Sequence, residues 1–201
     1  MNGNDVVTEF KSFIQKVRLI IQPLFLSFPS VIFWYASYTF GFHSNSKADE
    51  PIVNAILPFI GGVHVFLASF LLYREGSDIR ELKKILRRPH TEETRRDFMD
   101  IAEDMIPIPV KYILLSTGTM IQAWTIFLYY QNYYVGFFSV YSISYIITLI
   151  WEVIMDLDDP VHGAWVVKGI PKEWEQSFKI KKRWSDQIFD KVFGTTAAGR
   201  I

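Results

Sequence analysis

Three long stretches of the chain contain no charged side chain. Residues 19–42, 51–73 and 112–151 lack Asp, Glu, Lys and Arg altogether, although charged residues make up 21% of the 201-residue sequence. The hydrocarbon core of a bilayer is about 30 Å thick and requires about 20 apolar residues per helix. The first two stretches therefore predict one membrane span each, and the third predicts two, at about 110–130 and 135–155. The sequence indicates an all-α, multi-pass membrane protein with four transmembrane helices.

Basic residues fall almost entirely on one side of these spans. Of the 21 Lys and Arg residues, only Lys47 lies in the first or the third connection between spans. The others precede span one, separate spans two and three, or follow span four. By the positive-inside rule, this basic side is cytoplasmic. We therefore expect both termini in the cytoplasm and the protein in a plasma or inner membrane. The equal number of acidic residues argues against a nucleic-acid partner.

Charged segments and prolines divide the chain further. A cytoplasmic rod is expected to continue from span two and to end at Pro89, and Thr91 is a candidate N-cap for a second helix. The expected parts are a cytoplasmic amphipathic segment at 1–18, a membrane domain at 19–155 with a cytoplasmic helical insert at 74–109, and an acidic turn with an amphipathic tail at 156–201. The tail, rich in Trp and Lys, is expected to bind anionic lipids or to pack against the rod.

Polar side chains inside spans three and four recur at helical spacing. These side chains are costly in hydrocarbon unless they face protein or water. We expect them either to line an aqueous path or to hold the helices together. His64 in span two is expected to form a hydrogen bond within the bundle. The polar face consists of Ser116, Thr119, Gln122, Tyr145, Thr148 and Glu152.

Acidic residues gather where span four ends. Asp156, Asp158 and Asp159 follow Glu152 closely, so their like charges require compensation. A calcium ion bound by these carboxylates is one hypothesis. Pairing with arginines of residues 74–96 is a second, and simple solvation is a third.

Catalytic signatures are missing from the sequence. The chain has no cysteine, which excludes disulfides and thiolate chemistry. It also contains no nucleophile–base arrangement, no glycine-rich phosphate loop and no zinc-helix motif. We therefore expect that the protein is not an enzyme.

Three segments, taken in order, carry a resemblance to a known family. They are the helix that leaves span two from Phe70 to Arg74, the proline-containing entry to span three from Ile106 to Tyr112, and the acidic turn from Asp156 to Gly163. Their order and the four-span topology resemble the bestrophin family of ion channels and its shorter bestrophin-like relatives. The likeness covers roughly residues 55–175.

The resemblance implies a homo-oligomer, a pentamer, with span two lining a narrow central pore for small ions. The neck candidates are Val65, Ser69 and Tyr73, or, with the register shifted by one residue, Phe66 and Phe70. It also implies a calcium site at the acidic turn. The expected function is thus an oligomeric ion-channel subunit, and the alternative is a non-conducting scaffold or accessory subunit of a larger membrane complex.

Overall fold

A computed structural model describes residues 3–42, 50–103, 106–159, 167 and 169–175. Within these residues the chain is all-helical, with no strand, which confirms the all-α part of the predicted fold class. The helices are α1 (Gly3–Leu26), α2 (Phe28–Phe40), α3 (Glu50–Ile85), α4 (Glu92–Glu103), α5 (Ile108–Phe127), α6 (Tyr133–Leu157) and α7 (Lys172–Glu175). Most of the predicted tail, and part of the acidic turn, lie outside the described residues.

Three helical stretches in the described part are long and apolar enough to cross a membrane. They are Lys16–Phe40, Ala55–Ile85 and Tyr133–Leu157. These lengths and compositions are those of a multi-pass membrane protein. Helix α5, which the sequence predicts as a further span, is 20 residues long and is not among these three stretches; it contains Lys111, Gln122 and several hydroxyl side chains.

The first span is broken by its prolines. Helix α1 continues without interruption from the N-terminal segment through Pro23 to Leu26, and α2 begins one residue after Ser27 with Pro29 in its first turn. Proline supplies no backbone donor and fits a helix best at its start. At the break, the amide and the hydroxyl of Ser27 both donate to the carbonyl oxygen of Pro23, at 3.0 and 2.7 Å. The chain therefore has a local break between two helices at Ser27.

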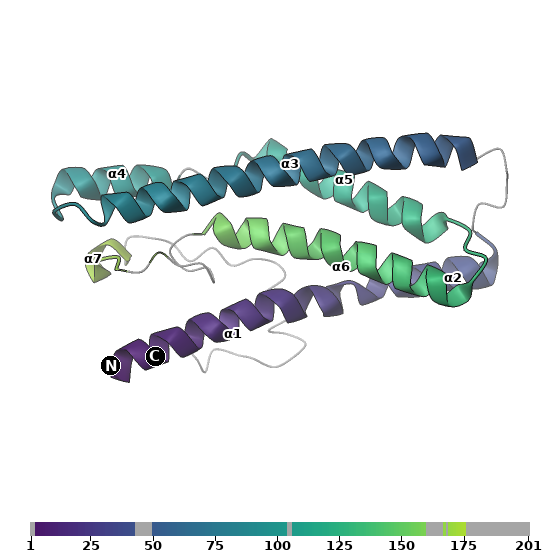
Figure 1. The fold of residues 1–201 in the computed structure, drawn as a ribbon, viewed down its shortest axis with the longest axis horizontal. Helices are drawn as coiled ribbons and strands as arrows, with labels where there is room; N and C mark the ends of the chain where they lie inside the picture. Colours follow the sequence, from purple (N-terminus) through teal and green to yellow (C-terminus); the bar gives the residue numbers. More distant parts are fainter. Residues whose placement is uncertain (1–2, 43–49, 104–105, 160–166, 168, 176–201) are drawn as a thin grey trace.

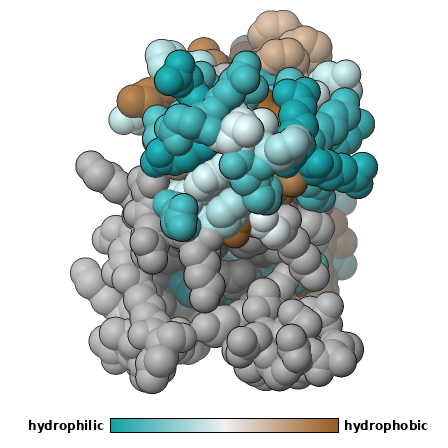
Figure 2. Space-filling view, turned by 90° about the vertical axis from the view of Figure 1, so that its left-hand side faces the viewer, coloured by the Kyte–Doolittle hydropathy of each residue, from teal (hydrophilic) through white to brown (hydrophobic). Residues whose placement is uncertain are grey.

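The long helices run side by side along one axis of the molecule (Figure 1). Helix α3 contacts α4, α5 and α6, and α6 also contacts α1, α2 and α5. Figure 1 places α4 and α7 at the end where α1 begins. Figure 2 views this end and shows hydrophilic side chains gathered over it. Within the described residues, the molecule thus has an apolar shaft, formed by the long helices, and a polar end where α4 and α7 lie.

At the polar end, α3, α4 and α7 share a small core. Phe98 of α4 and Trp174 of α7 are buried, and their rings lie 5.5 Å apart. Ile79, Leu82 and Ile85 of α3 complete the cluster with Ala102 and Val167. Trp174 belongs to the predicted tail, and it packs within this chain's own α3–α4 pair.

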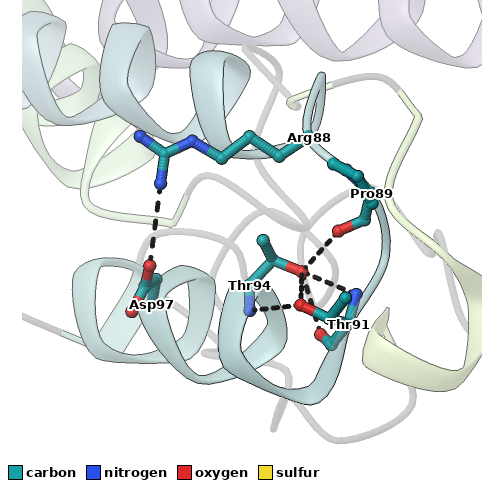
Figure 3. A network of polar contacts seen from close by, with 5 residues as sticks. All are labelled: Arg88, Pro89, Thr91, Thr94 and Asp97. Carbon is teal, nitrogen blue, oxygen red and sulfur yellow. Dashed lines mark hydrogen bonds and ion pairs between the residues drawn. The ribbon is translucent and has the colours of Figure 1, made fainter.

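The turn between α3 and α4 is held by hydrogen bonds around one buried threonine (Figure 3). The Thr94 hydroxyl lies 2.8 Å from both the amide nitrogen of Thr91 and the carbonyl oxygen of Pro89. The Thr91 hydroxyl accepts from the amide of Thr94 at 3.3 Å, as an N-cap does. Helix α3 ends at Ile85, four residues before the predicted stop at Pro89, and the predicted helix after Thr91 is present as α4.

At the other end of the shaft, aromatic side chains join α2 to α6. Trp34 is buried, and its ring lies 5.1 Å from that of Tyr133. Gly136 of α6 permits Trp34 to pack closely against α6, because a Cβ atom at Gly136 would lie 2.5 Å from the Trp34 ring. The side chain of Asn132 caps the start of α6 by accepting from the amide of Tyr134 at 2.9 Å.

Candidate functional site

Helix α3 has two faces with different surroundings. His64, Ala68, Leu71 and Glu75 are buried against the rest of the protomer. These residues follow one another at three or four positions, which is one face of an α-helix. All five neck candidates, Val65, Phe66, Ser69, Phe70 and Tyr73, lie on the exposed side. The structure therefore does not choose between the two predicted registers.

The centre of the exposed face is an aromatic stripe with a seven-residue repeat, formed by Phe59, Phe66 and Tyr73. Their side chains are 72%, 71% and 72% exposed, compared with 60% for Val65 and 55% for Phe70. Seven residues of an α-helix turn through about 700°, which is nearly two full turns, so the three rings lie almost in line. The stripe takes one residue from each predicted register and adds Phe59, which the sequence reasoning missed although the repeat is readable in the sequence.

A cavity lies behind the opposite face of α3, between α3, α5 and α6. Its volume is about 370 Å³, within the range of small-molecule sites. Four residues of the predicted polar face line it, namely Thr119, Gln122, Thr148 and Glu152. Ser116 and Tyr145 are not part of the lining. The apolar lining consists of Leu26, Pro29, Leu114, Leu115, Ile147 and Trp151, with Gly118 and His64 completing it.

The two threonine hydroxyls of the polar face are satisfied within their own helices. Thr119 donates to the carbonyl of Leu115, and Thr148 donates to that of Ser144, each at 2.8 Å. The contact between helices is made instead by His64, whose Nδ1 lies 2.9 Å from the Thr117 hydroxyl oxygen. This is the bundle hydrogen bond expected for His64, and Thr117 is a residue that the polar-face prediction did not include.

The acidic turn is anchored to the start of α5. Asp158 is buried; its Oδ1 accepts from the amide of Ile106 at 2.9 Å and its Oδ2 from Lys111 Nζ at 2.8 Å. Lys111 therefore compensates the negative charge of Asp158. This cation lies outside the 74–96 segment that was predicted to supply it. No periodic pattern reveals a pair 47 residues apart.

A small cavity borders this ion pair. Its volume is about 10 Å³, the space that one water molecule needs, and Glu75, Asp78 and Asp158 all line it. Glu75 is buried, and its Oε1 has no hydrogen-bond partner among the described residues. Sequence reasoning missed Glu75, because a glutamate one residue after the basic Arg74 reads as an ordinary solvated charge.

The predicted calcium site is not assembled in the part of the chain that the structure describes. No group of three or more His, Asp or Glu side chains there has an arrangement that could hold a metal ion. Asp158 forms an ion pair with Lys111. Asp156 is buried within α6, and Asp159 lies after the end of α6. Calcium binding by these residues stays a prediction.

Comparison with known proteins yields no relative. No family model, no curated protein and no solved structure matches the chain. The resemblance to bestrophins therefore rests only on the segments quoted above and stays a prediction.

The Asp158–Lys111 pair predicts a large and specific stability effect. Replacing Asp158 with Ala leaves Lys111 and the Ile106 amide without their acceptor, which should cost about 3 kcal/mol, since removing one partner of a buried pair is strongly destabilising. The matched control is Asp97→Ala, because the Arg88–Asp97 pair is exposed and 3.8 Å long, so its loss should cost less than about 1 kcal/mol. Tryptophan fluorescence during thermal unfolding in mild detergent measures both, and equal shifts would contradict the assignment.

Proposed function

We propose that the chain is a subunit of an oligomeric ion channel in which α3 lines a central pore. The observation that carries the proposal is the aromatic stripe of Phe59, Phe66 and Tyr73 on the face of α3 that the protomer leaves exposed. A seven-residue repeat is the spacing at which parallel helices pack around a common axis. Copies of α3 arranged in this way present rings of aromatic side chains to the axis. Following the bestrophin-like resemblance, the oligomer is a homopentamer that conducts small ions.

The length of α3 supports this arrangement. Its 36 residues extend about 54 Å at 1.5 Å per residue, which exceeds the thickness of the hydrocarbon core. The charged part of α3 therefore continues beyond the bilayer, where α4 and α7 pack on it. A pore lined by α3 leads directly into this charged end of the molecule.

A four-span topology with both termini in the cytoplasm belongs to the proposal. Helix α5 has 20 residues, about 30 Å, and Lys111 near its start reaches Asp158 at the end of α6. Its one charged residue is thus paired, and the rest of α5 can lie in hydrocarbon beside α3 and α6. The protein is then an integral protein of a plasma or inner membrane.

Reporter fusions test this topology. An alkaline phosphatase or green fluorescent protein moiety fused after Ile201 should report the cytoplasm, and the same reporter inserted at Asn45 should report the opposite side, because nearly all basic residues lie on the terminal side. If both reporters land on one side, the four-span arrangement is wrong.

Single-channel recording tests the pore. Purified protein in planar bilayers should conduct, and Phe66→Ala and Tyr73→Ala should each raise the unitary conductance, by about twofold or more, because an aromatic ring narrows and dries a pore. The matched control is Phe138→Ala, which removes a 62% exposed aromatic ring from α6 and should leave conductance unchanged.

The same recordings distinguish a channel subunit from the alternative, a non-conducting accessory subunit. If the wild-type protein and all variants insert correctly but carry no current, the result would contradict the channel proposal and favour a non-conducting accessory subunit. A conductance raised by Phe138→Ala but by neither α3 variant would place the pore elsewhere.

A further inference from the structure

The cavity between α3, α5 and α6 has the size and the walls of a site for a small apolar molecule. Its volume is about 370 Å³, and most of the residues that line it are apolar. An apolar cavity of about 150 Å³ inside a protein already takes up benzene. This cavity therefore has room for a larger organic molecule, whose orientation the few polar groups of the lining would fix.

The side chain of Gln122 gives the cavity a polar group that needs a partner. Gln122 belongs to α5 and lines the cavity, and its carboxamide makes no hydrogen bond to any of the described residues. A carboxamide contains a carbonyl oxygen that accepts and an NH₂ group that donates. Without partners these atoms are costly in the hydrocarbon region of a bilayer. A ligand in the cavity supplies the missing hydrogen bond.

Other polar side chains of the lining have partners within the protein or are out of reach. The hydroxyls of Thr119 and Thr148 donate to carbonyl oxygens of their own helices. The Nδ1 atom of His64 lies 2.9 Å from a hydroxyl of α5, and its Nε2 atom is buried. Glu152 also has an interaction within the protein. The polar group of a ligand is therefore expected at Gln122.

The charges of the lining indicate an uncharged ligand. Neither lysine nor arginine occurs among the residues that line the cavity, so an anionic group finds no counter-charge there. The carboxyl group of the lining, that of Glu152, already interacts within the protein, so it does not call for a cationic ligand. A hydroxyl group is uncharged and suits a carboxamide, because it donates to the carbonyl oxygen or accepts from the NH₂ group.

The rim of the cavity indicates the route of entry. Pro29 of α2 and Leu115 and Thr119 of α5 line the cavity and are also exposed on the surface of the apolar shaft. A molecule dissolved in the bilayer reaches the cavity between these residues. The body of the ligand is therefore apolar.

We propose that this cavity binds a lipophilic alcohol from the bilayer, whose hydroxyl group forms a hydrogen bond with the carboxamide of Gln122. The site is distinct from the exposed face of α3, so it goes beyond the channel function and does not depend on it.

Photolabelling tests the proposal directly. The probe is octanol that carries a diazirine group, applied to the full-length protein in mild detergent, and mass spectrometry identifies the labelled residues. Labelling of the cavity lining should be saturable. Unlabelled octanol should protect the lining fully, octane more weakly because it has no hydroxyl group, and octanoate not at all. Absence of saturable labelling in the lining would overturn the proposal, as would protection by octane, octylammonium or octanoate that equals or exceeds protection by octanol.

Variants locate the hydroxyl group of the ligand. Gln122→Leu keeps a side chain of similar size without hydrogen-bonding atoms, so the affinity for octanol should fall by about threefold to tenfold, the contribution of one neutral hydrogen bond. The affinity for octane, measured by its protection of the same residues, should not fall. An unchanged preference for octanol over octane in Gln122→Leu would contradict the role of Gln122.

A second pair of variants tests the cavity itself. Thr119→Trp fills the exposed rim without replacing a buried side chain and should abolish labelling of the lining, which keeps the proposal testable if Gln122→Leu does not fold. Ser142→Ala changes an exposed position of α6 outside the lining and is the matched control, which should be labelled as the wild type is. Labelling that survives Thr119→Trp would show that the alcohol binds elsewhere and would contradict the proposal.

Discussion

Helix α3 must satisfy two environments along a single stretch of 36 residues. Backbone groups in hydrocarbon have to be bonded within the helix, so the chain has no alternative fold there. The side chains then decide orientation. A continuous buried face, from His64 through Leu71 and Glu75 to Leu82, fixes α3 against α5, α6 and α4. Everything on the opposite face, including the aromatic stripe, is left for contacts outside the protomer.

The two faces of α3 give the protein two separate places for chemistry. The exposed side offers aromatic rings at a seven-residue repeat, which suit an assembly of identical helices. The buried side places His64 at the wall of a cavity that α5 and α6 complete. Gly118 makes the close approach possible, because a Cβ atom there would lie 2.8 Å from Ile147 and 3.2 Å from the His64 ring. One helix therefore borders both the proposed pore and this cavity.

Local signals in the sequence predict the helices well, but they do not predict the contacts between residues that are far apart in the chain. Charge-free stretches mark the apolar helices because hydrocarbon tolerates few charges, and Pro89 with Thr91 marks the α3–α4 turn because both act through the local backbone. Four of the six residues of the predicted polar face of α5 and α6 line the cavity, and their role in an aqueous path or in helix contacts stays a prediction. The Asp158–Lys111 pair and the direction of His64 depend on how separate helices pack, for which one sequence carries no periodic signal.

Cysteine cross-linking tests most directly whether copies of α3 meet through their exposed faces. The chain has no cysteine, so single cysteines can be placed in the native background. In membranes treated with a short bis-maleimide, Phe59→Cys, Phe66→Cys and Tyr73→Cys should form covalent dimers, whereas Ala68→Cys and Leu71→Cys should not, because those positions are buried within the protomer. Failure of all three stripe positions to cross-link, or cross-linking at the buried positions to the same extent, would contradict the account.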